Sequence, residues 1–180
     1  MKVLLHTCCG PCAIVPLRDL RSDGFEVFGT YFNPNIHPYQ EWERRREALE
    51  GLSNVSGARL LPVPAYEPLE WWRAVVFRES ERCRLCYHLR LRHTALLARR
   101  GRFDAFSTTL LYSKFQKHEL IQELGEASAK EADVPFLYRD WRSGWKEGVD
   151  ASKALGLYRQ PYCGCLLSEQ ERFAPKRGGS

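Results

Sequence analysis

Short apolar runs along the chain alternate with longer segments in which apolar residues recur at helical spacing. The apolar runs predict strands at 2–7, 25–32, 58–64, 103–111 and 135–140. The helical spacing predicts helices at 13–23, 39–52, 67–100 and 118–132. Such alternation predicts an α/β fold, with a mostly parallel sheet and helices on both of its faces.

In a parallel sheet of this kind, ligands bind beyond the carboxyl ends of the strands. The first strand leads directly into "HTCCGPC" at residues 6–12, so this loop is the expected position of a site. The helix at 67–100 has one irregularity, because Arg92 falls on its apolar stripe. We expect Arg92 to form a buried ion pair or to contact a substrate.

The length of 180 residues suits one domain with its own hydrophobic core. We find no repeat or linker, and expect a single α/β domain over 1–170 with a disordered basic tail at 171–180. No apolar run approaches the roughly 20 residues of a membrane helix. The start, "MKVLLHT", turns polar too early for a secretory signal. These features predict a cytoplasmic protein without a membrane partner.

The net charge of +5 is unevenly distributed, with basic clusters at 44–46, around Arg90 and at 98–102. Such clusters suit a phosphate backbone. Solvated helix faces explain a net charge of this size equally well, so charge alone does not assign a partner.

The seven cysteines lie in three groups, and their odd number excludes complete pairing into disulfides. The groups are Cys8, Cys9 and Cys12, then Cys83 and Cys86, then Cys163 and Cys165. In a reducing compartment, clustered cysteines more often bind metal or carry out redox chemistry than form structural disulfides.

Three kinds of site can use the first two groups. Cys9-Gly-Pro-Cys12 matches the dithiol motif of thioredoxin-like oxidoreductases, but that interpretation leaves the other cysteines unexplained. A zinc ion would take Cys83-x-x-Cys86 as one good pair, but the adjacent Cys8 and Cys9 are a poor second pair. A 4Fe–4S cluster accommodates neighbouring cysteines more easily. Its four thiolates would come from Cys8, Cys9, Cys83 and Cys86.

The third group, Cys163-Gly164-Cys165, can close only a very small and strained disulfide ring, which is easily reduced. Gly164 provides the backbone freedom that such a ring needs. From the residues alone, a reversible dithiol, a further pair of metal ligands and a buried pair in a turn stay open as interpretations.

Five motifs follow one another from Val3 to about Ser168: "HTCCGPC", "YFNPNIHPYQEWERR", "RCRLCYHLRL", "FSTTLLYSKFQKH" and "GLYRQPYCGCLLS". Together they resemble the cobalamin-independent epoxyqueuosine reductases. The resemblance implies a fold similar to that of the adenine-nucleotide α-hydrolase-like proteins. It also implies the last step of queuosine synthesis in tRNA, in which the epoxide of epoxyqueuosine is reduced to a cyclopentene.

The resemblance further implies a 4Fe–4S cluster whose ligands are Cys8, Cys9, Cys83 and Cys86. It implies that Cys163 and Cys165 are the catalytic pair and form a redox-active disulfide. An additional iron is implied at Cys12, where some family members have Asp. The implied partners are tRNA, through an anticodon loop bearing epoxyqueuosine, and an external electron donor. Competing interpretations are a thioredoxin-like dithiol oxidoreductase and a non-catalytic zinc- or cluster-binding protein that interacts with tRNA.

Removal of an epoxide oxygen to leave an alkene takes two electrons and two protons and releases water. We expect Cys163 and Cys165 to end this reaction as a disulfide that the external donor resets. The candidate proton donors are Tyr112, Lys114, His118 and Tyr162.

The segments around Arg44 and Arg90 are candidate contacts to the tRNA backbone. Recognition of a base in an RNA loop also uses stacking on aromatic side chains. The candidates are Phe32, Tyr39 and Trp42, and core packing is the stronger expectation for Phe32.

Overall fold

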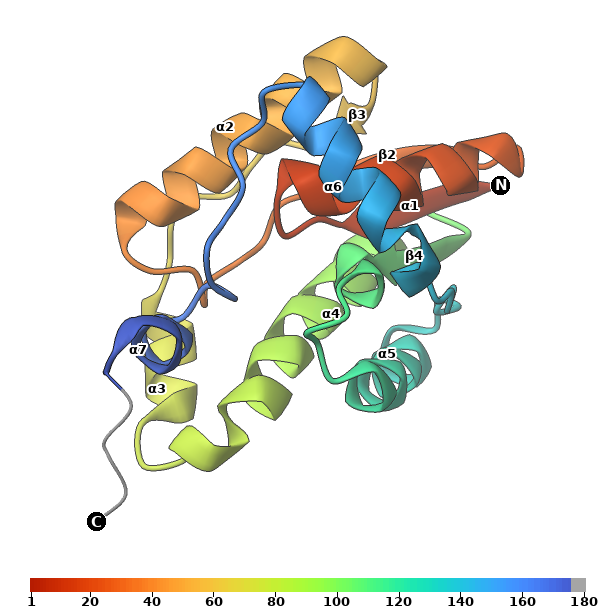
Figure 1. Cartoon of the computed structure of the whole chain (residues 1–180). Helices are drawn as coiled ribbons and strands as arrows, with labels where there is room; N and C mark the ends of the chain where they lie inside the picture. The colour runs from red at the N-terminus through yellow and green to blue at the C-terminus, as the bar shows by residue number, and fades with distance from the viewer. Residues whose placement is uncertain (176–180) are drawn as a thin grey trace.

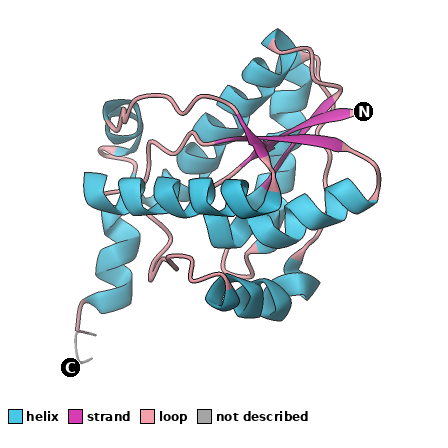
Figure 2. Ribbon diagram, turned by 90° about the horizontal axis from the view of Figure 1, so that it is seen from above, coloured by secondary structure: helices cyan, strands magenta, loops and turns pink. Residues whose placement is uncertain are grey.

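In the computed structural model, which describes residues 1–175, four parallel strands form one sheet in the order β3–β2–β1–β4 (Figures 1 and 2). The strands are β1 Lys2–His6, β2 Glu26–Thr30, β3 Arg59–Leu60 and β4 Ala105–Thr108. Leu4 of the central strand β1 pairs with Phe28 of β2 on one side and with Phe106 of β4 on the other. Both faces of β1 are buried beyond its first residue, which explains its continuous apolar run.

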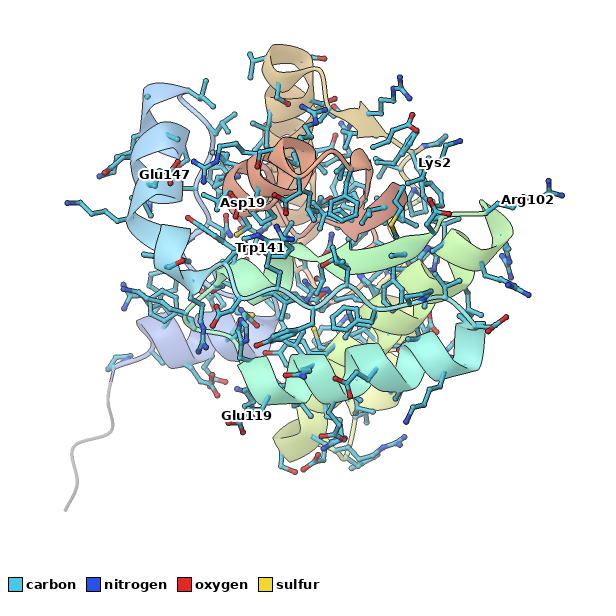
Figure 3. All side chains as sticks on the ribbon, turned by 90° about the vertical axis from the view of Figure 1, so that its right-hand side faces the viewer. Lys2, Asp19, Arg102, Glu119, Trp141 and Glu147 are labelled. Carbon is cyan, nitrogen blue, oxygen red and sulfur yellow. The ribbon has the colours of Figure 1, made fainter. Side chains whose placement is uncertain are left out.

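Helices cover both faces of this sheet, which confirms the expected fold class. Their bounds are α1 Gly10–Ser22, α2 Tyr39–Ser56, α3 Leu69–Val75, α4 Arg82–Arg100, α5 His118–Ala132, α6 Trp145–Ala154 and α7 Leu166–Phe173. Short 3₁₀ turns lie at η1 Glu79–Glu81, η2 Thr109–Tyr112 and η3 Arg142–Gly144. Helices α1, α2 and α6 pack together on one face, and α4 and α5 pack together on the other (Figure 1). Figure 3 shows Glu147 of α6 on the side of Asp19 of α1, and Glu147 forms an ion pair with Arg18.

The first turn of α1 lies very close to α2 because its first residue is glycine. A Cβ atom on Gly10 would clash with the carbonyl oxygen of Ala48 in α2. Pro11 suits the next position, where its missing N–H has no helical acceptor to lose. This close packing fixes the start of α1, where Cys9 and Cys12 lie.

The path of the chain through the sheet creates a switch point beside β1. From β1 the chain passes through α1 to β2 and through α2 to β3, and it then returns through α4 to β4 on the opposite side of β1. The loops that leave β1 and β4 therefore diverge toward opposite faces of the sheet. In open parallel sheets such a divergence is where ligands bind.

The predicted continuous helix at 67–100 is wrong. The structure divides this segment into α3, η1 and α4, and Phe77 lies between α3 and η1 with a φ of +62°. A bulky residue in the left-handed region interrupts a helix, and the spacing of apolar residues does not reveal it.

Three strand predictions also differ from the structure. The fourth strand, predicted at 103–111, is restricted to Ala105–Thr108, and η2 begins at Thr109. The third strand is restricted to Arg59–Leu60, because Pro62 and Pro64 lack the N–H groups that would continue the ladder. The predicted fifth strand at 135–140 is wrong, since Phe136 forms only an isolated bridge with Phe106 and no ladder follows it.

Helix α7 extends to Phe173 and so includes the first three residues of the segment that was expected to be a tail. Residues 176–180, with the rest of that expectation, lie outside the described residues. The single domain over 1–170 stays a prediction. Over residues 1–175, none of the helices has both the length and the apolar character that crossing a membrane requires.

Candidate active site

Three cysteine sulfurs meet where β1 passes into α1. The Sγ atoms of Cys8, Cys9 and Cys12 all lie within 4.8 Å of one another, and all three residues are buried. Cys9 is the N-cap of α1, and its Sγ accepts a hydrogen bond from the backbone N–H of Cys12 at 3.4 Å. Three thiols in one buried cluster are a donor set that can bind a metal ion.

The end of β4 holds this cluster in place from the other side of the switch point. The Thr109 hydroxyl accepts a hydrogen bond from the backbone N–H of Cys8 at 3.1 Å and lies 3.4 Å from its Sγ. At the last residue of each strand, His6 Nδ1 of β1 and Thr108 Oγ1 of β4 lie 2.9 Å apart. Hydroxyl groups at the end of β4 thus set the position of the first cysteine.

The surroundings of the three thiols shift their pKa values in different directions. Hydrogen bonds from Cys12 and Cys9, together with the charge of Arg90, hold the pKa of Cys8 well below its usual value, although burial opposes this. Burial raises the pKa of Cys9, and hydrogen bonding to Cys8 raises that of Cys12. The cluster therefore favours one thiolate, at Cys8.

A buried guanidinium lies beside these sulfurs. Arg90 of α4 is 2% exposed, and it donates hydrogen bonds to Cys86 Sγ at 3.2 Å and to His6 Nε2 at 3.4 Å. Burial, and then the charge of Arg90, lower the pKa of His6 to about 3, so its ring is neutral and can accept that bond. Within residues 1–175, no carboxylate lies at ion-pair distance from Arg90.

This isolation is unusual because a buried charge without an opposite charge is very costly. Burial works against the charged form of Arg90, whereas negative charge on Cys86 and Cys8, when these thiols are ionised, raises the pKa of Arg90 above its ordinary value. The buried cation therefore requires negative charge on the sulfurs around it. Arg90 itself is too buried to contact a tRNA phosphate, whereas Arg92 in the same basic segment is exposed, so contact of the segment around Arg90 with tRNA stays a prediction.

The second cysteine pair lies on α4, one turn before Arg90. Cys86 is buried, and burial raises its pKa to about 12, with the charge of Arg90 acting in the opposite direction. Cys83 is half-buried. Charges on Cys163 and Cys165 act on both thiols and raise both pKa values further, so the third cysteine group lies close to the second.

The third group occupies a tight turn before α7. Cys163 is exposed, whereas Cys165 is buried and is the N-cap of α7, accepting a hydrogen bond from the backbone N–H of Ser168. Gly164 has a φ of +149°, and a Cβ atom there would press against Asn35 and Ile36. The turn thus depends on glycine, and the two thiols are not bonded to each other.

A second buried arginine fixes this turn to α2. Arg45 donates to the carbonyl oxygens of Cys163 at 2.8 Å and Tyr162 at 3.0 Å, and its Nε donates to Glu41 at 2.8 Å. The hydroxyl of Tyr158 donates to the other oxygen of Glu41 at 2.5 Å. Although Arg45 belongs to the basic cluster at 44–46, its role is internal, and Arg44 beside it is exposed.

A cavity of about 530 Å³ joins the first and third cysteine groups. Cys8, Cys12 and Cys163 line it, as does Arg90. Its volume lies in the range of about 300–1,000 Å³ that is usual for small-molecule sites. Reactive sulfur therefore faces a space that can hold a small molecule.

Two glutamines that the sequence analysis did not single out also line this cavity. Gln160 Nε2 lies 3.0 Å from Cys9 Sγ and 3.4 Å from Cys12 Sγ, and Gln116 Nε2 lies 3.4 Å from Cys163 Sγ. The hydroxyl of Tyr87 holds Gln116 by donating to its Oε1 at 2.7 Å. Both glutamines lie within the five motifs, and this position in the sequence could have identified them as residues of the site.

The candidate proton donors lie in different surroundings. Tyr112 and Tyr162 line the cavity, but their hydroxyls donate to the carbonyl oxygens of Trp145 and His37. Lys114 is exposed beside Phe115. His118 is buried outside the cavity lining, with Nε2 2.8 Å from the carbonyl oxygen of Leu111. The assignment of the proton donor stays open.

The remaining expectations concerned surface contacts. Trp42 is buried against Tyr31, so its predicted stacking on a base is wrong, whereas Tyr39 is exposed. Phe32 stacks on His93 with 3.7 Å between ring centroids. Arg92 does form an ion pair, with Glu131, but the pair is exposed rather than buried.

Comparison with known proteins gives consistent matches over nearly the whole chain. The family model described as "Epoxyqueuosine reductase QueH" matches residues 3–171. A protein of that name from Dehalococcoides mccartyi is 40% identical over 172 residues, which are 96% of this chain and 94% of that protein. Another of that name, from Thermotoga maritima, is 36% identical and aligns with 94% of this chain and 91% of its own length.

A solved structure also resembles this fold. It is described as a predicted subunit of a tRNA methyltransferase from Methanocaldococcus jannaschii, and it superimposes with a TM-score of 0.57 at 12% identity. The match covers 85% of this chain and 74% of that chain. At this identity the likeness concerns the fold alone, and it agrees with the expected fold class.

Proposed function

The chain belongs to the epoxyqueuosine reductase QueH family, and from this premise we propose that it reduces the epoxide of epoxyqueuosine in tRNA to the cyclopentene of queuosine. Family membership confirms the resemblance inferred from the motifs and makes the protein an oxidoreductase. The observation that best supports this chemistry in the chain itself is the buried Arg90, which lies among sulfurs and, within residues 1–175, has no carboxylate partner.

We propose that Cys8, Cys9, Cys83 and Cys86 bind a 4Fe–4S cluster. Thiolates are the ligands that such clusters use, and a thiolate-bound cluster carries the negative charge that Arg90 requires. Cys12 is then the ligand available to an additional iron, because it lies in the same buried cluster as Cys8 and Cys9. When bound, these groups supply single electrons at the cavity wall and Lewis-acid character toward an epoxide oxygen.

The chain's own contribution to the electron balance is the dithiol of Cys163 and Cys165. The two thiols give up two electrons and two protons and form one S–S bond, while the epoxide loses both C–O bonds, gains a C=C bond and releases its oxygen as water. An external electron donor then reduces the disulfide back to two thiols. Exposure of Cys163 at the cavity supports this assignment, because the resetting reductant must reach a sulfur atom.

Other residues of the cavity orient the sulfurs. The amide of Gln116 donates toward Cys163, and the Tyr87 hydroxyl fixes that amide. Gln160 does the same for Cys9 and Cys12 on the opposite wall. Apolar side chains of Leu110 and Trp145 also line the cavity.

The decisive test compares Cys83→Ser with Cys12→Ser in protein purified without oxygen. The parent is expected to be brown and to hold about four or five irons. Cys83→Ser should lose the cluster absorption and most of the iron, whereas Cys12→Ser should keep the cluster and lose at most the additional iron. The reverse pattern would place the metal on the Cys8–Cys9–Cys12 cluster alone and contradict the proposed ligand set.

The activity itself is tested by incubating the reduced protein with an anticodon stem-loop that carries epoxyqueuosine. Mass spectrometry should show loss of one oxygen from the modified nucleoside. A Cys163→Ser/Cys165→Ser double variant should fail in multiple turnovers, and full turnover by that variant would remove the dithiol from the scheme.

A further inference from the structure

The mouth of the cavity carries an exposed aromatic residue where a buried one would be expected. Phe115 is 76% exposed although it lines the cavity together with Trp145. The two rings meet edge to face with 5.4 Å between centroids. The Lys114 ammonium lies 5.5 Å from the centroid of each ring. The Phe115 ring is thus held at the opening of the cavity by Trp145, and the Lys114 ammonium lies beside it.

Two further cations line the same cavity. Arg159 precedes the turn of the third cysteine group and Arg172 lies on α7, and both are exposed. In the described part of the chain, neither these two nor Lys114 lies at ion-pair distance from a carboxylate. The acidic residue among them, Glu171, is already paired with Arg82. The mouth therefore presents positive charge that the protein itself does not neutralise.

The size of the cavity determines what must contact this mouth. A volume of about 530 Å³ holds one nucleoside but not an RNA stem-loop. When the reacting nucleoside lies against Cys8 and Cys163, the nucleotides on either side of it must lie outside, over the surface formed by Phe115 and the three cations. Single-stranded RNA binds such surfaces by stacking bases on aromatic rings and by placing phosphates on Lys and Arg.

We propose that this mouth, made of Lys114, Phe115, Arg159 and Arg172, is the contact surface for the RNA strand that flanks the reacting nucleoside. Phe115 stacks on a base next to that nucleoside, and the three cations contact backbone phosphates. This inference rests on the proposed function, since it takes the substrate to be part of an RNA. A protein electron donor with an acidic surface is the other partner that a basic mouth could attract, but it would have no use for an exposed π-face.

The stacking contact is tested by measuring the affinity of holoprotein, kept free of oxygen, for a fluorescent anticodon stem-loop. Phe115→Leu keeps apolar bulk but removes the π-face, and it should weaken binding roughly tenfold or more. Phe115→Trp should restore binding. Phe77→Leu is the matched control, because Phe77 is 93% exposed and does not line the cavity, and it should bind as the parent does.

The phosphate contacts are tested by the dependence of affinity on salt. Each of Lys114→Gln, Arg159→Gln and Arg172→Gln should reduce the slope of log K against log salt by about 0.7. Lys130→Gln, an exposed residue of α5 outside the cavity, should leave that slope unchanged. A purely structural role for these residues would change affinity without changing the slope.

Parent-like affinity and slope in all of the mouth variants would overturn the proposal, as would failure of the parent to bind the stem-loop. Unchanged RNA binding with slower re-reduction by the electron donor would assign the mouth to that donor instead. The same preparations separate this inference from the proposed function. A parent that reduces the epoxide while the variants bind RNA normally contradicts the inference alone, whereas a reduced parent that binds the stem-loop without turnover contradicts the proposed function.

Discussion

Replacement of Arg45 by methionine tests whether the turn of the third cysteine group depends on a buried charge. Arg45 is 1% exposed, and its removal leaves the Glu41 carboxylate buried with one hydrogen bond, from Tyr158. It also removes the donor from the carbonyl oxygens of Tyr162 and Cys163. Loss of one partner from a buried ion pair costs about 3–5 kcal/mol of unfolding free energy. Against a total of about 5–15 kcal/mol for a typical domain, this is a large fraction.

The neighbouring Arg46 provides the control. Arg46→Met removes an arginine from the same helix, but its ion pairs with Glu43 and Glu50 are partly exposed, with 24% of its side chain accessible. Exposed pairs of this kind contribute about 0–1 kcal/mol. Arg46 forms two such pairs, so denaturant titration of both variants in the same metal state should separate them by at least about 1 kcal/mol.

A second readout localises the effect to the turn. Cys165 is buried in the parent, and its alkylation rate should rise in Arg45→Met but not in Arg46→Met. Adding Glu41→Gln to Arg45→Met should recover part of the stability, because the uncompensated charge is then gone. Equal stability of Arg45→Met and Arg46→Met, with unchanged alkylation of Cys165, would refute this account of the turn.

Three further substitutions have defined outcomes. Gly164→Ala should cost about 1–3 kcal/mol in thermal unfolding, because a φ of +149° is strained for alanine, and an unchanged melting temperature would contradict it. Gly10→Ala should reduce the iron bound per chain, since the new Cβ pushes α1 away from Ala48 and displaces Cys9; parent-like iron content would count against this. Burial lowers the pKa of His37 to about 4, so the fold holds it neutral and its stabilisation, complete above about pH 6.5, is lost as pH falls toward 4. His37→Phe should therefore lose less stability between pH 7 and pH 5 than the parent, by roughly 2 kcal/mol in denaturant titrations, and equal losses would refute the effect.

The sequence predicted the sheet and the position of the first cysteine group because both depend on local pattern. A run such as Val3–Leu5 is apolar throughout only when both faces of a strand are covered, and the loop after it then lies at the end of the sheet. The interruption at Phe77 was not predictable in the same way, because helical spacing continues on both sides of it.

Arg45 and Arg90 were interpreted as surface charge, because their burial depends on contacts between distant parts of the chain. Whether an arginine is buried depends on partners brought together by folding, and His6 lies 84 residues from Arg90 in the chain. A local signal was nevertheless present, since Glu41 precedes Arg45 by one helical turn and Cys86 precedes Arg90 by the same spacing. An arginine that follows a glutamate or cysteine by four residues in a helix can therefore be predicted as a buried residue.

The bond from Arg45 to Cys163 also constrains when the enzyme can be completed during its synthesis. These residues are 118 positions apart along the chain. While the ribosome is still extending the chain, α2 therefore carries a guanidinium that lacks two of its acceptors. The cavity wall that carries Cys163 is consequently assembled later than the cysteine cluster at the start of α1, and a metal that needs both parts of the site binds only after both have been made.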